Sequence, residues 1–466
     1  MIFQQYNLSC LSHFSYMVGD EETATAVIVD PQRDIDNYVK DAQEMGLEIK
    51  YVFLTHFHAD FVAGHLELRD RAGAKICLGT VAQAEAEFET LAFKDGESLE
   101  FGKVRMQVID TPGHTPEGVS ILVYDLATDS EKPQSILTGD TLFIGDVGRP
   151  DLLGSLGMAA TDLAGMLYRS IQEKILPLPD ETLIYPAHGA GSMCGRALST
   201  ETVSTMGEQR KYNYALQPMS EAEFTALVIA DQPDAPQYFV YDAIMNRKEH
   251  RTLDESLQRS LKPLAAAELI RQQKEGAQVL DVREPADYEG AHVANSLNIG
   301  LSGRFATFAG ILLDSDAPIV IVAEPGREEE AAMRLGRIGY DNVIGYLEGG
   351  MAALASQQDV TRRTERITPA TVGEHLRLPN PPVIIDVRME NEFKEMRIEG
   401  SLNIPLNHLL ERIEEVPTDR AVVVHCQSGY RTAIAMGILE QHGRTNATHM
   451  VGGLAAWKAS RLATVS

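Results

Sequence analysis

Residues 54–65 read LTHFHADFVAGH, and they hold four side chains that bind metals in proteins: His56, His58, Asp60 and His65. The apolar residues 51–54 predict a buried strand, which places the His-x-His-x-Asp group on the loop where that strand ends. We expect a helix to open at Phe61. Alternate residues on a tight loop can converge on one point, and imidazole plus carboxylate is the ligand set of zinc and iron. The stretch therefore predicts a metal site.

Three later segments carry further metal-binding side chains at strand ends. His114 follows the run VRMQVID, in a turn of Gly and Pro residues that fixes its direction. Asp140 ends the segment LTGD, and His188 lies in YPAHGAGS. Because strand-like runs alternate with helical stretches in this part of the chain, we expect these loops to meet at one edge of stacked sheets. The sequence therefore predicts one site rather than scattered surface histidines.

The composition is that of a globular protein of about three domains, at ~150 residues per domain. The net charge is 41 − 67 = −26, which argues against nucleic acid or an anionic membrane as a partner. No apolar stretch reaches the ~18 residues of a membrane span. The start of the chain shows no basic segment followed by an apolar core, so we expect a cytoplasmic protein. Four cysteines are too few for a disulfide framework.

The second half of the chain repeats itself. The motif Asp-Val-Arg at residues 281–283 returns at residues 386–388, which is 386 − 281 = 105 residues later. Each copy predicts the order helix, strand, loop, strand, loop and helix, which is one α/β module. Four side chains of these motifs are expected to be structural, tying a strand end to its neighbouring loop: Asp281, Arg283, Asp386 and Arg388.

Three domains follow from these patterns. The first covers residues 1–250 and ends in a charged, Pro-punctuated extension and connector around residues 205–262. The two α/β repeats cover residues 260–360 and 365–466. Residues 202–217 are suited to a contact between subunits, and we expect a homo-oligomer.

The four metal-binding loops resemble those of the metallo-β-lactamase superfamily over about residues 1–200. That resemblance implies an αββα sandwich, so the expected fold class is α/β and α+β: one such sandwich followed by two α/β domains. In two-metal members of the superfamily, a further His follows the His-x-His-x-Asp motif and helps to hold the second ion. Here Phe61 stands at that position, and an apolar ring in place of an imidazole favours a site with one metal.

Within the superfamily, the chain resembles the persulfide dioxygenases of the ethylmalonic encephalopathy protein family. The segment GDVGRPDL, which contains Arg149, is similar to theirs. The resemblance implies one Fe(II) per chain, held by His56, His114 and Asp140. Two imidazoles and one carboxylate leave open positions on Fe(II) for substrate and O₂. The remaining metal-binding side chains then surround the ligands and orient them: His58, Asp60, His65 and His188.

Two further residues are candidates for substrate binding in this domain. Arg149 would contact a carboxylate or phosphate of the thiol carrier, although a surface ion pair fits the residue type equally well. Cys194, six residues after His188, would lie at the rim of the pocket. A reactive thiol there would accept or relay sulfur, and an inert packed cysteine is the alternative.

The second repeat carries a candidate sulfur-binding loop in the run VVVHCQSGYRTA. Cys426 to Arg431 form a six-residue loop between a strand and a helix. Backbone N–H groups near a positive helix end stabilise an anion there, and Arg431 adds a fixed positive charge. This signature resembles the single-domain rhodaneses, which are sulfurtransferases, over about residues 365–466. Cys426 and Arg431 are therefore the candidate catalytic residues of this repeat.

The first repeat has no cysteine at the corresponding place. The pair Gly349-Gly350 returns as Gly452-Gly453, an offset of 452 − 349 = 103 residues, which aligns Ala323 with Cys426. A one-residue gap would align Glu324 instead. Neither side chain offers sulfur, so this repeat resembles an inactive rhodanese that is kept for packing, docking or carrier binding.

The domain order as a whole resembles the multidomain bacterial persulfide dioxygenase–sulfurtransferase fusions. It implies that a small-molecule persulfide of glutathione, coenzyme A or a similar carrier reacts with O₂ to give sulfite and thiol. Cys426 would pass a sulfur atom to sulfite, giving thiosulfate in sulfide detoxification. One alternative is a zinc thioester hydrolase of the glyoxalase II kind with accessory rhodanese domains. Another is a non-catalytic scaffold for sulfur relay.

Overall fold

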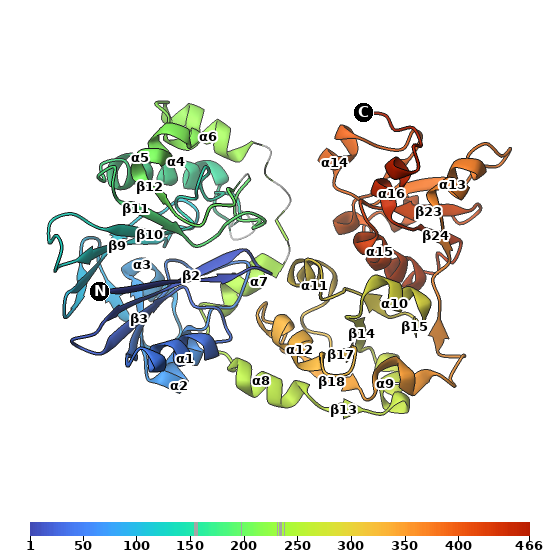
Figure 1. Cartoon of the computed structure of the whole chain (residues 1–466), viewed down its shortest axis with the longest axis horizontal. Coiled ribbons are helices and arrows are strands. Elements are labelled where there is room, and N and C mark those ends of the chain that lie inside the picture. Colours follow the sequence, from blue (N-terminus) through green and yellow to red (C-terminus); the bar gives the residue numbers. More distant parts are fainter. Residues whose placement is uncertain (153–156, 197, 231, 233–234, 237) are drawn as a thin grey trace. The chain divides into compact units, whose positions relative to one another are not determined.

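The computed structural model describes residues 1–466 except 153–156, 197, 231, 233, 234 and 237. Its contacts divide the chain into two compact units (Figure 1). The first unit comprises Met1–Glu255 with Gly336–Gly339, and the second comprises Ser256–Leu335 with Tyr340–Ser466. Among the helices in the described part of the chain, none is both long and apolar enough to cross a lipid bilayer.

Two six-stranded sheets form the centre of the first unit (Figure 1). The first sheet has the order β1-β2-β3-β4-β5-β6: β1 (Ile2–Leu8), β2 (His13–Asp20), β3 (Thr25–Val29), β4 (Glu48–Phe53), β5 (Lys75–Gly79) and β6 (Leu91–Phe93). The second has the order β12-β11-β10-β9-β8-β7: β7 (Ser98–Phe101), β8 (Val104–Asp110), β9 (Val119–Asp125), β10 (Ser135–Gly139), β11 (Leu183–Pro186) and β12 (Ser204–Thr205).

The inner faces of the two sheets enclose one apolar core, to which Val27 and Phe53 of the first sheet and Val108 and Ile121 of the second belong. The helices pack on the sheets from outside: α1 (Asp36–Glu44), α2 (His65–Ala72) and α3 (Thr80–Glu85) on the first, and α4 (Ala160–Ser170), α5 (Met206–Tyr212) and α6 (Glu221–Ile229) on the second. Each sheet buries one apolar face against the other sheet and one against helices. The expected αββα sandwich is confirmed.

The metal-binding loop follows β4, which pairs in parallel with both β3 and β5. The expected strand is present and ends at Phe53, one residue before the last apolar residue of the run, Leu54. The expectation that a helix opens at Phe61 is wrong, because α2 begins at His65. The Phe61 carbonyl and the Ala63 amide bond the side chain of Asn246. The amides of Val62 and Gly64 donate to the carbonyls of Arg337 and Pro31, so this segment forms no helix of its own.

The second unit contains two parallel five-stranded sheets with the same strand order. The first has the order β13-β18-β17-β14-β16: β13 (Pro263–Leu264), β14 (Gln278–Asp281), β16 (Leu297–Asn298), β17 (Ile319–Val322) and β18 (Val343–Leu347). The second has the order β20-β24-β23-β21-β22: β20 (Arg366–Ile367), β21 (Val383–Asp386), β22 (Leu402–Asn403), β23 (Val422–His425) and β24 (Ala447–Met450). The expected pair of α/β repeats is confirmed.

Helices complete the two repeats (Figure 1). The first contains α9 (Ala266–Lys274), α10 (Pro285–Gly290), α11 (Phe305–Leu312) and α12 (Glu328–Gly336). The second contains α13 (Pro369–His375), α14 (Glu390–Glu395), α15 (Tyr430–Gln441) and α16 (Gly453–Ala459). Two more helices precede the repeats: α7 (Tyr238–Met245) and α8 (Leu253–Ser260).

The Asp-Val-Arg motif forms the same buried clamp in both repeats. The Arg283 guanidinium donates to both carboxylate oxygens of Asp281 and, 2.8 Å away, to the carbonyl of Ala291. Arg388 makes the same contacts to Asp386 and donates to the carbonyl of Met396 at 2.6 Å. The structural role expected of these pairs is confirmed, since each one ties a strand end to the next loop.

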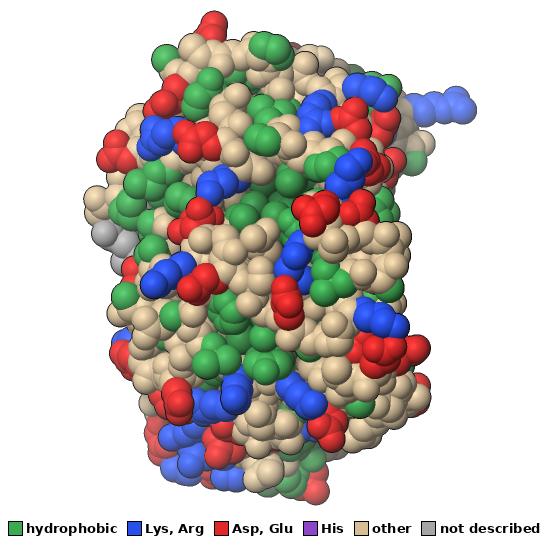
Figure 2. All heavy atoms as spheres, turned by 90° about the vertical axis from the view of Figure 1, so that its left-hand side faces the viewer, with side chains coloured by type: hydrophobic (Ala, Val, Ile, Leu, Met, Phe, Trp, Pro, Cys, Tyr) green, Lys and Arg blue, Asp and Glu red, His purple; other side chains and the backbone are tan. Residues whose placement is uncertain are grey.

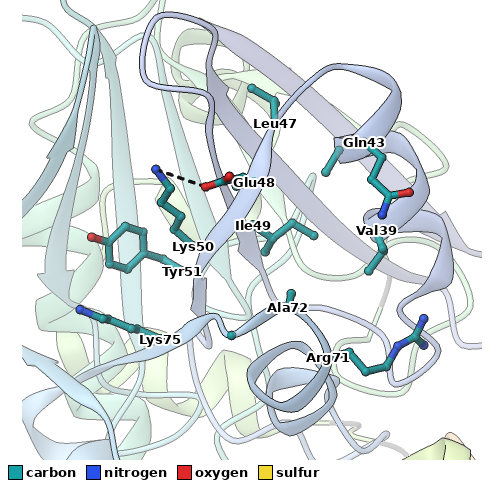
Figure 3. A pocket seen from close by; sticks show the side chains of 12 residues that line it. Val39, Gln43, Leu47, Glu48, Ile49, Lys50, Tyr51, Arg71, Ala72 and Lys75 are labelled. Carbon is teal, nitrogen blue, oxygen red and sulfur yellow. Dashed lines mark ion pairs between the residues drawn. The ribbon is translucent and has the colours of Figure 1, made fainter.

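On the face shown in Figure 2, acidic, basic and apolar side chains are interspersed. A groove of about 550 Å³ lies beside the amino ends of β4 and β5 (Figure 3). Its charged side chains include Arg71, which pairs with Asp36 at 2.7 Å, and Lys50, which pairs with Glu48 at 3.7 Å. Because the metal-binding loop follows the carboxyl end of β4, this groove lies at the other end of the strand.

Candidate active sites

Three loops of the first unit bring His56, His114 and Asp140 together. These residues follow β4, β8 and β10, and all three are buried. Their ligand atoms lie within 4.8 Å of one another. Asp140 Oδ2 is 3.9 Å from His56 Nε2 and 3.5 Å from His114 Nε2. The cluster expected from the sequence as a two-His-one-carboxylate set therefore converges on one point.

The second ring nitrogen of each histidine is held from outside the cluster. His56 Nδ1 lies 3.0 Å from the Thr55 hydroxyl, and His114 Nδ1 lies 2.9 Å from the carbonyl of Arg149. His114 Nε2 and Asp140 Oδ2 are buried and have no hydrogen-bond partner among the described residues. Unpaired buried polar atoms are costly, and atoms that face one another in this way suit a cation that all three residues would bind.

The charge states also fit a metal. Burial and the neighbouring His58 lower the pKa of His56 well below its usual value, and burial lowers the pKa of His114. Burial alone would raise the pKa of Asp140, but His188 and the two other histidines hold it well below its usual value. Neutral imidazoles and an ionised carboxylate are the forms in which these side chains bind metal ions.

A second group adjoins the first: His58, Asp60 and His188 also place their ligand atoms within 4.8 Å of one another. His188 bridges two carboxylates, with Nδ1 2.8 Å from Asp140 and Nε2 2.9 Å from Asp60. Burial would lower the pKa of His188, but Asp140 and Asp60 raise it well above its usual value. His58 Nε2 lies 3.0 Å from a carboxylate oxygen of Asp30. These residues are suited to holding the first cluster in place.

Phe61 fills the space beside this second group. Its ring centroid is 4.4 Å from that of His58 and 4.2 Å from that of His13. The side chain is almost fully buried, with 1% of its surface exposed. An apolar ring therefore packs against two imidazoles of the site.

His13 is a residue of the site that the sequence did not single out. It begins β2, is fully buried and forms an isolated antiparallel bridge with His188. Neither of its ring nitrogens has a hydrogen-bond partner among the described residues. A lone histidine at the start of a strand gives no sequence signal, because only this bridge brings it to the site.

Asn246 was also missed, since it lies in the segment expected to be a connector. It follows α7 and is fully buried. Its side-chain amide donates to the carbonyls of His58 and Phe61, each at 2.8 Å, and its carbonyl accepts from the amide of Ala63 at 2.8 Å. Three hydrogen bonds from one side chain fix the metal-binding loop.

Arg149 lies beside the first cluster, with 1% of its surface exposed. Its guanidinium donates two hydrogen bonds of 2.7 Å to Asp151 and one of 3.2 Å to the carbonyl of Met193. Its own carbonyl faces His114, as described above. These contacts join the loops around the site, and a contact from Arg149 to a substrate carrier stays a prediction.

Cys194 and His65 differ in their distance from the metal-binding groups. The Cys194 thiol lies within 4.8 Å of ligand atoms of Asp140 and His188. Burial, Asp60 and Asp140 raise its pKa well above the usual value, which favours a protonated thiol. His65 belongs to neither histidine cluster, and its ring packs 4.9 Å from that of Phe88.

Cys426 lies in the second repeat, directly after β23, with 1% of its surface exposed. Its Sγ accepts a hydrogen bond of 3.1 Å from the amide of Gly429, the residue that caps the 12-residue helix α15. Arg431 donates two hydrogen bonds, of 2.6 and 2.8 Å, to Glu392. The thiol therefore lies at a helix N-terminus, where an anion is stabilised.

The corresponding loop of the first repeat is already filled. Ala323 directly follows β17, as Cys426 follows β23, so the structure favours Ala323 over Glu324 as the aligned residue. Gly326 corresponds to Gly429, since 429 − 103 = 326. Its amide donates at 2.8 Å to the carboxylate of Glu328 rather than to a sulfur atom. The carboxylate of Glu328 therefore bonds the amide that would otherwise face a bound anion.

Comparisons with known proteins agree with this architecture. The family described as metallo-beta-lactamase superfamily matches residues 8–188, and the rhodanese-like domain family matches residues 265–357 and 368–460. The human mitochondrial persulfide dioxygenase ETHE1 is 35% identical over 219 residues, which cover 46% of this chain and 75% of that protein. The chain belongs to the persulfide dioxygenase family. Two rhodanese-like domains extend this family member at its C-terminal side.

Two other proteins show how far the likeness extends. A solved structure titled metallo-beta-lactamase, from Staphylococcus aureus, covers 74% of this chain and 98% of its own, with 30% identity and a TM-score of 0.65. A hydroxyacylglutathione hydrolase from Polaromonas is 30% identical over 177 residues, 38% of this chain and 62% of that protein. The resemblance to a persulfide dioxygenase joined to two rhodanese domains is confirmed, and so is the expectation of an enzyme.

Proposed function

We propose that the protein oxidises a small-molecule persulfide with O₂ and couples this reaction to sulfur transfer at Cys426. The oxidation is RSSH + O₂ + H₂O → RSH + SO₃²⁻ + 2 H⁺. The transfer begins with RSSH + Cys426–SH → RSH + Cys426–SSH. Sulfite then accepts the outer sulfur: Cys426–SSH + SO₃²⁻ → Cys426–SH + S₂O₃²⁻. Thiosulfate is the product, and sulfide detoxification is the proposed role.

The observation that carries the proposal is the cluster of His56, His114 and Asp140 beside Phe61. Two imidazoles and one carboxylate suit Fe(II) with positions left for other ligands. Iron held there would supply the redox chemistry between the persulfide sulfur and O₂. The apolar ring of Phe61 weakens the case for a second ion beside it.

The surrounding residues have defined tasks in this proposal. His188 holds Asp140 Oδ1 at 2.8 Å, so that Oδ2 faces the two histidines. The Arg149 carbonyl and the Thr55 hydroxyl orient the two imidazoles. Asn246 keeps the loop closed around His58. Such outer partners typically account for about 10- to 100-fold in metal affinity or activity.

Sulfur transfer is assigned to the loop around Cys426. The amide of Gly429 and the start of α15 stabilise negative charge on sulfur. Gln427 and Ser428 are exposed and form the outer part of the loop, through which donor and acceptor would approach. Joining both reactions in one chain would raise the local concentration of sulfite near the Cys426 persulfide with which it reacts.

The test measures metal, O₂ uptake and thiosulfate in three proteins. Anaerobically purified wild-type protein should contain about one iron per chain, because the two histidines and one carboxylate form one site for Fe(II). His114→Ala should lose iron and O₂ uptake with glutathione persulfide or coenzyme A persulfide. Cys426→Ser should keep O₂ uptake, because the first unit is intact, and release sulfite in place of thiosulfate. Normal thiosulfate output from Cys426→Ser would overturn the coupling.

A second candidate function is a two-zinc thioester hydrolase. The group of His58, Asp60 and His188 favours it, since three close ligand types could hold another ion. The same metal analysis separates the two, because two zinc ions per chain would replace the iron. Thioester hydrolysis without O₂ uptake would then identify the activity.

Other parts of the proposal concern the setting of the enzyme. Glutathione, coenzyme A or a similar thiol is the proposed carrier, because each presents the same reacting group. The cytoplasm is the proposed location, and a homo-oligomer is the proposed assembly. Gel filtration with light scattering tests the assembly, and comparison of kcat/KM for the two persulfides tests the carrier.

A further inference from the structure

The loop that holds Cys426 rests on the first repeat. The hydroxyl of Tyr430, at the start of α15, donates at 2.7 Å to the carbonyl of Gly300. A Cβ atom on Gly303 would lie 2.2 Å from the Tyr430 ring, so the backbone and the ring are in close contact there. Further along α15, Gly437 approaches the backbone of the first repeat at Ser296, where an added Cβ would lie 3.1 Å from the carbonyl oxygen.

His449 lies behind the same loop, in β24 of the second repeat. It is buried, with 3% of its surface exposed. A Cβ atom on Gly429 would be 3.6 Å from both Cε1 and Nε2 of this imidazole, so one edge of the ring faces the Gly429 backbone. His449 Nε2 has no hydrogen-bond partner among the described residues. The ring thus backs the residue whose amide holds Cys426 Sγ.

Glu289 of the first repeat holds the other edge of that ring. It lies in α10 with 4% of its surface exposed, and its carboxylate accepts a hydrogen bond from His449 Nδ1. The other carboxylate oxygen is 3.6 Å from Arg366. Because the pair is buried and charge-assisted, it fixes the ring more firmly than a contact exposed to water would.

We propose that Glu289 and His449 form a positioning pair across the two repeats, which sets the place of Gly429 and thereby of Cys426 Sγ. The first repeat has no cysteine in its own loop, yet it supplies one half of this pair. It is then a working part of the sulfurtransferase site rather than a passenger. The proposal rests on the proposed sulfur transfer at Cys426 and names residues that act through the loop without touching substrate.

The test uses the full chain and a matched control in the same interface. Glu289→Ala and His449→Ala remove the pair, and Glu289→Gln keeps an acceptor for His449 Nδ1. The control is Glu440→Ala near the far end of α15, which removes contacts of 2.9 Å to His292 and 2.8 Å to the amide of Asn295. Two rates are measured: sulfur transfer from thiosulfate to cyanide, and alkylation of Cys426 by iodoacetamide, followed by mass spectrometry.

Removing the pair should lower kcat for sulfur transfer about ten-fold, the scale on which one charge-assisted hydrogen bond acts, with KM for thiosulfate little changed. Alkylation of Cys426 should become faster, because the buried thiol is held less firmly. Glu289→Gln keeps the acceptor but not the charge, so its kcat should lie between those of Glu289→Ala and the wild type. Glu440→Ala should leave both rates near those of the wild type. O₂ uptake should not change in any variant.

Three results would overturn the inference. The first is a wild-type kcat and alkylation rate in Glu289→Ala. The second is an equal loss in Glu440→Ala, which would mean that the interface only stabilises the fold. The third is a failure of Glu289→Gln to recover. Fluorescence of Trp457, the single tryptophan, shows whether the second repeat is folded. If wild-type protein transfers no sulfur, the proposed function fails, and the alkylation rates still decide the positioning role.

Discussion

The two rhodanese-like repeats share one scaffold and differ in one loop. Both have five parallel strands in the same order. Both also bury an Asp–Arg clamp whose Asp is the last residue of a strand, Asp281 in β14 and Asp386 in β21. In the second repeat, the Gly429 amide holds the sulfur of Cys426. In the first, the Gly326 amide holds the carboxylate of Glu328. The first repeat therefore has the same scaffold without a cysteine in this loop, and its Glu289 contacts His449 of the second repeat.

The clamps should produce the largest effects, and they should be equal in the two repeats. Arg388→Ala leaves Asp386 buried without its partner, and Arg283→Ala does the same to Asp281. Each change should lower the free energy of unfolding by about 3–5 kcal/mol, the usual cost of a stranded buried charge. Urea unfolding followed by circular dichroism and by Trp457 fluorescence measures both. If Arg283→Ala lowered the free energy of unfolding by less than ~1 kcal/mol, the scale of an exposed ion pair, the two clamps would not be equivalent.

The glycines of the two loops give a matched pair with different consequences. Gly429 has a φ of 124° and Gly326 a φ of 91°, and residues with a side chain rarely adopt either backbone angle. Ala at either position should cost about 1–2 kcal/mol of stability. Only Gly429→Ala should also reduce sulfur transfer, because only that amide bonds Cys426. Equal activity in the two variants would contradict the role assigned to the Gly429 amide.

Arg431 should have a smaller effect. Arg431→Lys replaces two hydrogen bonds to Glu392 with the contact of a single ammonium group, so the start of α15 is held less firmly beside Cys426. Sulfur transfer should fall about three-fold, a cost within the range of partly exposed ion pairs. The control is Arg412→Lys, which loses a similar pair of contacts to Glu415 on the surface. A drop of the same size in the control would remove the special role of Arg431.

The smallest effect is expected when sulfur is returned to the first repeat. In the Cys426→Ser background, Ala323→Cys should give no sulfur transfer, because Glu328 occupies the loop amide. The double change Ala323→Cys with Glu328→Arg removes that carboxylate and adds a positive charge, so a low rate should appear. Thiocyanate formation from thiosulfate and cyanide measures it. Activity in the single variant would show that Glu328 does not block the loop.

Much of this architecture was predictable because the decisive residues are local in sequence. The His-x-His-x-Asp motif after an apolar strand indicated the metal loop, and the six residues from Cys426 to Arg431 indicated the sulfur-binding loop. The helix expected from Phe61 was wrong, since distant residues take the backbone hydrogen bonds of that segment, among them Asn246, which bonds the amide of Ala63 from 183 residues away. No periodicity within residues 54–65 could reveal a partner so distant.

The sequence by itself determined the kinds of side chain that meet and the strand ends on which they stand, because strand patterns and motif spacing are short-range properties. It also determined which repeat carries sulfur, since neither Ala323 nor Glu324, the two residues that can align with Cys426, has a sulfur atom. Only the tertiary structure decided that His13 and Asn246 join the metal site and that Glu289 reaches His449. These are contacts between distant segments, and burial makes each of them matter because an unpaired polar group inside a protein is costly.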